Sequence, residues 1–226
     1  MTAEPAVSMP NMSMSSHPPH PLAHNMVLQV TGLTGGPGAT PFFSGMGLSL
    51  PPGVSALIGD EGSGKTTLLR LLAGDLQAQS GQMSLLGAAV PWPQPQPSAV
   101  FWTDLRLPLH DEDTPVQCWS AWASRLPHWS ETVKTSLIQA LQLSPHLDKR
   151  LNMLSTGSRR KVGLVASLAA GATVTLLDQP FVSLDAASIR TLQEVLSAHA
   201  SSPDRAWLIA DYEKPAHIPL AAVHPL

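Results

Sequence analysis

The chain has 226 residues, 43% of them hydrophobic, so it can bury a sizeable core as one α/β domain with a small subdomain. Its formal net charge of -3, with 13 Lys and Arg residues, gives no reason to expect a nucleic-acid surface. A single cysteine, Cys118, excludes an internal disulfide and suits a reducing compartment, and no basic-then-apolar secretion signal opens the chain.

Residues 1–25 are predicted to form a disordered tail. They are rich in Met, Pro, Ser and His and show almost no apolar periodicity. His17, His20 and His24 stand near several methionines, and these residue types bind soft or borderline metals such as copper. A flexible tract of this kind fixes no ligand geometry, so the composition is weak evidence for a metal site. The methionines also allow the alternative that the true start is Met26.

Strand-like segments come next. The first begins at residues 26–30, residues 32–41 are a turn-rich break, and a second strand is expected over about residues 42–50. A Pro-Pro-Gly turn then leads into the apolar run 54–58, which is typical of a buried strand. This order predicts a mixed sheet, in which an antiparallel layer leads into a parallel core.

A glycine-rich turn between this buried strand and a helix is the central motif of the chain. It reads Gly59, Asp60, Glu61, Gly62, Ser63, Gly64, Lys65, Thr66 and Thr67. The glycines let the backbone curl, so that several N–H groups and a helix N-terminus can point at one anion. Lys65 supplies a positive charge for the outer phosphates, and the Thr66 hydroxyl can ligate Mg²⁺. The motif therefore predicts binding of a nucleoside triphosphate with Mg²⁺; the alternative is a surface turn without chemistry.

The middle of the chain changes from short strands to helices. Residues 82–86 favour an edge strand, residues 91–97 form a proline-rich stretch that is either a spacer or a docking peptide, and residues 98–102 favour a buried strand. Residues 103–153 have helical periodicity. Their tryptophans can form either the core of a helical insertion or a partner-binding face, and we expect core packing: Trp119, Trp122 and Trp129.

A second motif ends in a carboxylate. Residues 173–178 are apolar and β-branched, which predicts a buried parallel strand with Asp178 at its carboxyl edge, where ligands of such sheets bind. A carboxylate there can hold Mg²⁺ opposite Thr66; the alternative is that Asp178 caps a turn. The apolar stretch 162–177 is interrupted by Gly and Thr, and we interpret it as helix, turn and strand rather than a membrane span.

Together these motifs resemble the ATP-binding cassette family, the nucleotide-binding subunits of ABC transporters, over about residues 26–216. The family signature LSGGQ is matched by Leu154, Ser155, Thr156, Gly157 and Ser158, and the Walker B motif at Asp178 runs into a D-loop of Ser183, Leu184 and Asp185. The resemblance implies an α/β P-loop NTPase fold with a mixed sheet, a parallel core plus an antiparallel β layer. It also implies an ATP-binding domain over residues 26–226, with a small helical subdomain inserted at about 104–153.

The resemblance also implies a mode of action. In this family two cassettes meet head to tail, and each ATP lies between one phosphate loop and the signature of the other subunit. Ser155 and the Gly157 backbone, at a helix start, suit an anion. The implied cofactors are ATP and Mg²⁺. The implied partners are a second cassette, in a homo- or heterodimer, and an integral membrane permease on whose cytoplasmic side the chain would dock.

Two catalytic positions depart from the family pattern. Gln179 stands where the family has a glutamate; its amide can orient water but cannot usefully accept a proton. Asp211 follows what looks like the last strand, residues 207–210, where the family has a switch histidine. A carboxylate at that position would repel a γ-phosphate that an imidazole would contact.

Further departures affect binding. The glutamine that ends the strand before the helical subdomain is replaced by Trp102 or Thr103, and no aromatic residue for adenine stacking stands between Leu33 and Pro41. Thr156 and Ser158 weaken the signature. We interpret these independent departures as natural degeneracy rather than an engineered trap.

We therefore expect MgATP binding, with hydrolysis that is slow or needs a more complete partner cassette. The alternative from another class is a regulatory protein that uses ATP binding only to control dimerisation. A phosphate-loop kinase would leave the signature and the D-loop unexplained. The transported substrate and the direction of transport cannot be read here, because substrate contacts lie in the permease.

Overall fold

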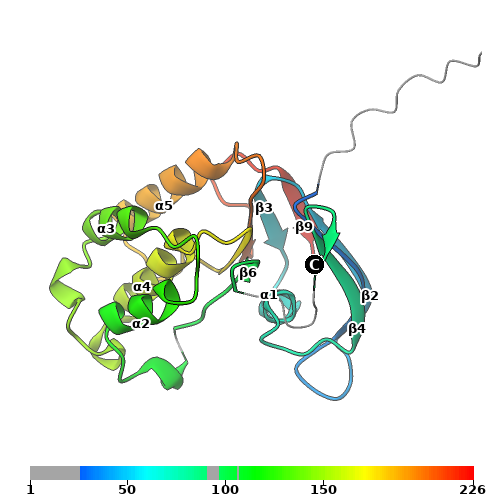
Figure 1. The fold of residues 1–226 in the computed structure, drawn as a ribbon, viewed down its shortest axis with the longest axis horizontal. Helices are drawn as coiled ribbons and strands as arrows, with labels where there is room; N and C mark the ends of the chain where they lie inside the picture. Colours follow the sequence, from blue (N-terminus) through cyan, green and yellow to red (C-terminus); the bar gives the residue numbers. More distant parts are fainter. Residues whose placement is uncertain (1–25, 91–96, 106) are drawn as a thin grey trace, which may run out of the picture.

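The structure, a computed structural model, describes residues 26–90, 97–105 and 107–226 (Figure 1). Two sequence predictions lie outside these residues: the disordered tail 1–25 with its metal-binding residue types, and all but the last residue of the proline-rich stretch 91–97. Among the described helices, none combines the length and the apolar character needed to cross a bilayer.

The strands form two sheets. The antiparallel sheet has the order β2-β1-β4-β5, with β1 at Leu28–Gly35, β2 at Phe43–Leu50, β4 at Ser80–Leu85 and β5 at Ala88–Ala89. The parallel sheet has the order β6-β7-β8-β3-β9, with β6 at Val100–Phe101, β7 at Val174–Asp178, β8 at Ala206–Asp211, β3 at Gly53–Ile58 and β9 at Ala222–Pro225. The predicted combination of an antiparallel layer and a parallel core is confirmed.

Both faces of the parallel sheet are covered, which explains why its strands are apolar without alternation. Leu176 and Leu208 face one core, which also contains the buried residues of the antiparallel sheet and of helix α1, Lys65–Ala73. Leu177 and Ile209, one residue further along the same strands, face the other core, which is formed with the remaining helices. Figure 1 shows α1 between the two sheets and the other helices gathered on the opposite side.

The remaining helices begin at side chains that cap their free N–H groups. Helix α2, Pro115–Ala123, starts with a capping box between Thr114 and Gln117. The caps of the other three are Ser130 for α3 at Glu131–Ala140, Ser155 for α4 at Thr156–Ala169, and Asp185 for α5 at Ala186–His199. The described residues also contain three short 3-10 helices: η1 at Pro108–His110, η2 at Ser144–His146 and η3 at Leu151–Met153.

The helical region packs as a core, as the sequence predicted for its tryptophans. Trp119 is buried and donates from its indole Nε1 to the Val162 carbonyl of α4 at 3.0 Å. Trp122 and Trp129 pack against the same core while staying partly accessible. The interpretation of residues 162–177 as helix, turn and strand is also confirmed, since α4 ends before Gly171 and β7 follows.

Three predicted boundaries were wrong. Strand β1 runs through the expected break to Gly35, because Gly32 has φ +65° and absorbs a register shift within the strand. The strand expected at 98–102 shrinks to Val100–Phe101, the two residues that pair with β7. Strand β8 is not the last strand, because β9 follows it in the chain and pairs with β3. The sequence of β9 is short and contains a proline, so it gives only a weak strand signal.

Candidate functional site

The loop between β3 and α1 has a tightly curled backbone. Gly62 and Gly64 adopt φ +77° and +97°, a region that side chains disfavour. A Cβ on Gly59 would lie 2.7 Å from the main-chain oxygen of Leu226 and 2.6 Å from the Ser63 Oγ, so a side chain at this position would require the backbone to shift. Helix α1 begins at Lys65, directly after this loop, and its N-terminal dipole therefore faces the loop. This arrangement is suited to an anion.

Lys65 is turned inward against the loop. Its side chain is only 6% exposed, and its Nζ donates to the carbonyl oxygens of Gly59 at 2.5 Å and Asp60 at 2.8 Å. The same Nζ lies 4.6 Å from the ring centroid of Tyr212, a cation–π contact. A buried ammonium group held by neutral groups is a strong attractor for an anion that reaches the loop.

Thr66 and Asp178 meet although 112 residues separate them. The Thr66 hydroxyl donates to the Asp178 carboxylate at 2.8 Å, which joins the start of α1 to the carboxyl end of β7. A hydroxyl and a carboxylate are oxygen ligands of the kind that Mg²⁺ prefers, so these two residues fit that ion. The sequence predicted these two residues as partners, and the structure brings them together.

The two atypical positions lie at the same edge of the sheet. Gln179 has φ +46°, and its N–H donates to the Ala210 carbonyl at 2.8 Å, which ties it to the end of β8. Asp211 is the last residue of β8 rather than a residue after it. Burial raises the pKa of Asp211; the nearby Asp178 adds to this rise, while the Tyr212 N–H and Lys65 act against it. The edge thus holds two neighbouring carboxylates, and Lys65 lies near one of them, Asp211.

The signature residues and the D-loop contact each other. Ser155 caps α4 and accepts from the Ser158 N–H at 3.1 Å. A Cβ on Gly157 would lie 2.4 Å from the Ser183 carbonyl oxygen, so only glycine fits beside the D-loop. Asp185 caps α5 and pairs with Lys161 at 2.7 Å; this hydrogen bond is the main reason that the pKa of Asp185 lies far below its usual value. Leu154, Thr156 and Leu184 complete the two motifs.

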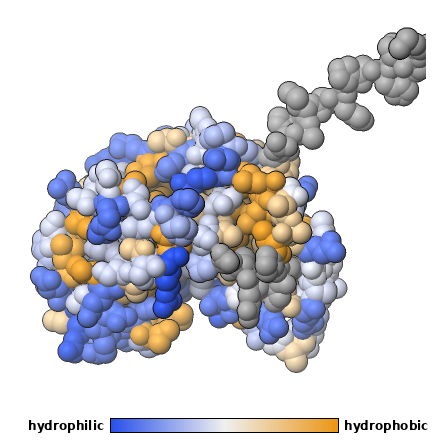
Figure 2. All heavy atoms as spheres, in the orientation of Figure 1, coloured by the Kyte–Doolittle hydropathy of each residue, from blue (hydrophilic) through white to orange (hydrophobic). Residues whose placement is uncertain are grey.

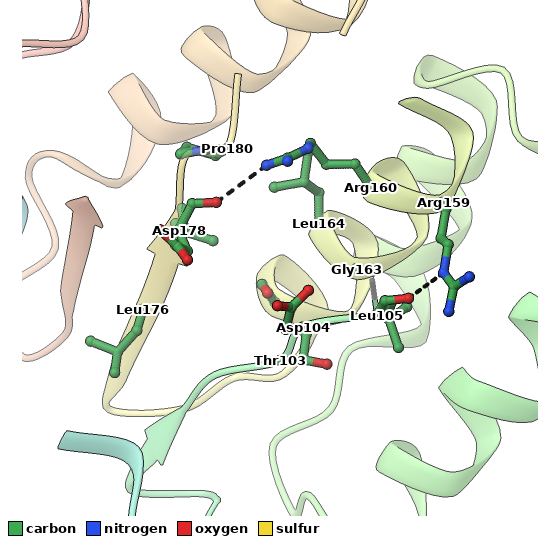
Figure 3. Close-up of a pocket in the computed structure, with 12 residues that line it drawn as sticks. Thr103, Asp104, Leu105, Arg159, Arg160, Gly163, Leu164, Leu176, Asp178 and Pro180 are labelled. Atoms are coloured by element: carbon green, nitrogen blue, oxygen red, sulfur yellow. Dashed lines mark hydrogen bonds between the residues drawn. The ribbon is translucent and has the colours of Figure 1, made fainter. Parts of the chain in front are cut away.

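A pocket beside Asp178 connects this edge to the helical region (Figure 3). Thr103, one of the two positions expected to replace the family's glutamine, lines it together with Asp104 and residues of α4, whereas Trp102, the other position, is not among its lining residues. Arg160 of α4 donates to the main-chain oxygens of Asp178, at 3.3 Å, and of Gln179. Figure 3 shows Arg160 reaching across to the Asp178 backbone from the opposite wall. Helix α4 therefore braces the end of β7.

One aromatic residue at the phosphate loop was missed by the sequence analysis. Phe42 is 52% exposed, and its Cε1 is the nearest atom, at 2.5 Å, to a Cβ built on Gly64. Phe43 holds its ring edge-on at a centroid distance of 5.0 Å. The residue lies one position beyond the range searched, Leu33 to Pro41. Two consecutive aromatic residues at the head of a strand were the available signal.

Comparison with known proteins agrees with this geometry. The family profile of ABC transporters matches residues 43–182. The chain is 35% identical over 162 residues to the taurine import ATP-binding protein TauB of Pseudomonas entomophila, a match that covers 71% of this chain and 62% of that protein. It is 29% identical to the cytochrome c biogenesis ATP-binding export protein CcmA of Hyphomonas neptunium, over 87% of this chain and 94% of that protein. The chain thus spans less than two thirds of the TauB protein.

Solved structures show the same fold. An ATP-binding subunit of an ABC transporter superimposes with a TM-score of 0.67 at 22% identity, over 82% of this chain and 79% of the other. A nucleotide-free ATP-binding cassette from an ABC transporter gives a TM-score of 0.65 at 19% identity, over 82% and 81%. With a family match over more than half of its residues and this fold, the chain belongs to the ABC transporter family.

Proposed function

We propose that this chain is the ATP-binding subunit of an ABC transporter and that it binds MgATP at a composite dimer interface to drive a membrane permease. The observation that carries the proposal is the 2.8 Å bond between Thr66 and Asp178 beside the buried Lys65. It places a hydroxyl, a carboxylate and an ammonium group at one sheet edge. Residues 26–226 would form the ATP-binding domain, with the helical subdomain at about 104–153.

The residues of the loop have distinct tasks. Lys65 exchanges the carbonyls of Gly59 and Asp60 for the outer phosphates, which offer a charged acceptor. The backbone N–H groups of the loop, residues 59–67, hold the remaining phosphate oxygens. Thr66 and Asp178 hold Mg²⁺, directly or through water. When bound, this ion neutralises charge that develops on the phosphates.

The signature supplies the second half of a composite site. Ser155 and the Gly157 backbone lie at the N-terminus of α4, which favours an anion by its dipole and its free N–H groups. Because Gly157 packs on the Ser183 carbonyl, the D-loop fixes the position of the signature within one chain. A second cassette, identical or related, would present its signature to the phosphate loop of this chain and close over the nucleotide.

Hydrolysis is expected to be slow. Gln179 is held by the backbone of β8 and can orient a water molecule, but its amide cannot take the proton of that water. Asp211 faces the same edge as a second carboxylate, and its raised pKa reflects the cost of a charge there. When ionised, it repels the outer phosphate that Lys65 attracts.

The helical region supports docking to a membrane partner. In the part of the chain that the structure describes, four apolar side chains of this region are exposed: Leu107 before η1, Leu109 in η1, Val116 in α2 and Met153 in η3. Figure 2 shows separate apolar patches on the helical half of the face drawn there. The TauB relative is named for import and the CcmA relative for export, and both names describe an ATP-binding protein.

The first prediction tests nucleotide binding. Lys65→Ala should weaken Mg²⁺-dependent binding of a fluorescent ATP analogue at least about tenfold, because charge-assisted hydrogen bonds contribute roughly 1.5–3 kcal/mol each. Lys149→Ala, a change at an exposed lysine of the helical region, is the matched control and should bind normally. Equal titration curves for the two variants would contradict the proposed site.

The second prediction concerns the adenine ring. Stacking of a base on an aromatic side chain contributes about 1–3 kcal/mol, so Phe42→Ala should weaken ATP binding about fivefold to a hundredfold. Inorganic triphosphate, which has no base, should bind equally well to both proteins. Phe42→Tyr should retain the wild-type affinity for ATP. Calorimetric titration separates the effects, and an equal loss for ATP and triphosphate would show that Phe42 only supports the loop.

The third prediction concerns the missing base. Gln179→Glu should raise the steady-state rate of ATP hydrolysis by about 10² to 10⁴, the usual contribution of a positioned base. The control is Gln142→Glu, because Gln142 is an exposed glutamine with a similar φ of +56° and the change adds the same charge. A wild-type turnover near the enzyme median of about 10 s⁻¹ would refute the idea of impaired catalysis.

The fourth prediction identifies the partner. Leu109 is 82% exposed, and Leu109→Glu should abolish co-purification with an integral membrane permease from detergent-solubilised cells. Leu86→Glu, at an exposed leucine after β4, should leave the complex intact. Recovery of soluble partners only would instead favour a regulatory protein that uses ATP to control dimerisation.

A further inference from the structure

Three side chains of metal-binding type meet in the helical region, and none belongs to the phosphate loop, the signature or the Walker B strand. They are His110 at the end of η1, Asp113 in the next turn, and Cys118 in α2. One ligand atom from each lies within 4.8 Å of the ligand atoms of the other two. Among the described residues, this is the group of His, Cys and acidic side chains that could hold an ion.

The separations are close to those of a tetrahedral zinc site. Zinc bond lengths to nitrogen, oxygen and sulfur imply ligand separations of roughly 3.4–3.6 Å. The His110 Nδ1 and the Asp113 Oδ2 already lie 3.4 Å apart. Without an ion, these two side chains form a long hydrogen bond, which is at the far end of the usual distance range. The Cys118 sulfur lies no more than 4.8 Å from either ligand atom, so it has to approach by roughly 1 Å at most.

The backbone holds these residues in place. The Asp113 N–H donates to the His110 carbonyl at 3.2 Å, so one turn presents both side chains. Thr114 closes a capping box with Gln117, which fixes the start of the helix that carries Cys118. The site is therefore built on ordered turns, and little entropy is lost when an ion is bound.

We propose that His110, Asp113 and Cys118 bind a borderline-soft divalent transition-metal ion, with Zn²⁺ as the best match. An imidazole nitrogen, a thiolate and a carboxylate form a mixed set that zinc accepts, whereas Mg²⁺ and Ca²⁺ prefer oxygen alone. Three protein ligands leave a fourth position for water or for a group from a docked partner.

Burial shapes the chemistry of the thiol. Cys118 is buried, which raises the pKa of its thiol to about 11, and the neighbouring Asp113 carboxylate adds to the rise. Because a thiolate rather than a thiol ligates such an ion, binding through the Cys118 sulfur releases its proton to the solvent.

An ion at this position would affect the segment that precedes the signature in the chain. The Asp113 carbonyl accepts from the Leu151 N–H at 2.8 Å, and the Asp111 carbonyl accepts from the Asn152 N–H at 3.1 Å. Both donors belong to η3, which directly precedes Leu154 of the signature. Metal binding would therefore stiffen the loop that carries the exposed Leu107 and Leu109 and fix it to the segment before α4.

The test is a Co²⁺ titration of the full-length protein under reducing conditions without nucleotide. A cobalt–thiolate bond gives a charge-transfer band that nitrogen and oxygen ligands do not give, and Cys118 is the one cysteine of the chain. We expect this band with one Co²⁺ per chain, its loss on addition of Zn²⁺, and release of one proton. Because no nucleotide is involved, failure here would be distinguishable from failure of the proposed function.

Single substitutions show whether all three residues bind the Co²⁺ ion or whether the Cys118 thiol binds it alone. Cys118→Ser should lack the band. His110→Ala and Asp113→Asn should each weaken Co²⁺ binding at least about tenfold, because even the loss of a residue that hydrogen-bonds to a metal ligand lowers metal affinity about 10- to 100-fold. His128→Ala, at an exposed histidine of the same region, should bind normally, as should a chain with alanine at the tail histidines: His17, His20 and His24. Absence of the band, or unchanged affinity in His110→Ala and Asp113→Asn, would overturn the proposal.

Discussion

The hydrogen bond between Thr66 and Asp178 is the constraint on which the site depends. It joins the first helix after the phosphate loop to a strand more than a hundred residues later, and it does so because β3 and β7 flank β8 in one parallel sheet. The carboxyl ends of these strands share one edge, so residues that follow them meet there. The loop glycines and the buried Lys65 then complete an anion site around this bond.

The two residues that depart from the family pattern, Gln179 and Asp211, lie at this carboxyl edge of the parallel sheet. Asp178 and Asp211 end neighbouring strands, and Asp211 lies near both Asp178 and the ammonium group of Lys65. An ionised Asp211 adds negative charge at the edge where we propose that the triphosphate binds, and the raised pKa of its carboxyl reflects the cost of ionising it there. Gln179 keeps the shape of a glutamate but not its basicity. The edge thus combines the Thr66–Asp178 bond with two residues that depart from the family pattern.

Close backbone contacts connect the parts of the cassette. Gly157 packs on the Ser183 carbonyl, which links the signature to the D-loop, and a Cβ on Gly171 would lie 2.1 Å from the His128 carbonyl, which links the helical region to the turn before β7. Such contacts leave no room for a side chain. We therefore expect the two segments that meet at each contact to move together as one rigid piece. A metal ion in the helical region would act through the same kind of rigid connection.

The sequence alone determined the chemistry and the order of the motifs. Period-two and apolar runs identified the strands, and the glycine pattern with Lys65 and Thr66 identified an anion site, because local patterns encode local structure. Tertiary structure alone decided which distant residues touch. The short β9 pairs with β3 because the sheet offers it an edge, and Phe42 reaches Gly64 because β2 folds beside the loop. Likewise, His110, Asp113 and Cys118 form a cluster only because a 3-10 turn and a capped helix bring them together, and no residue spacing in the sequence specifies that geometry.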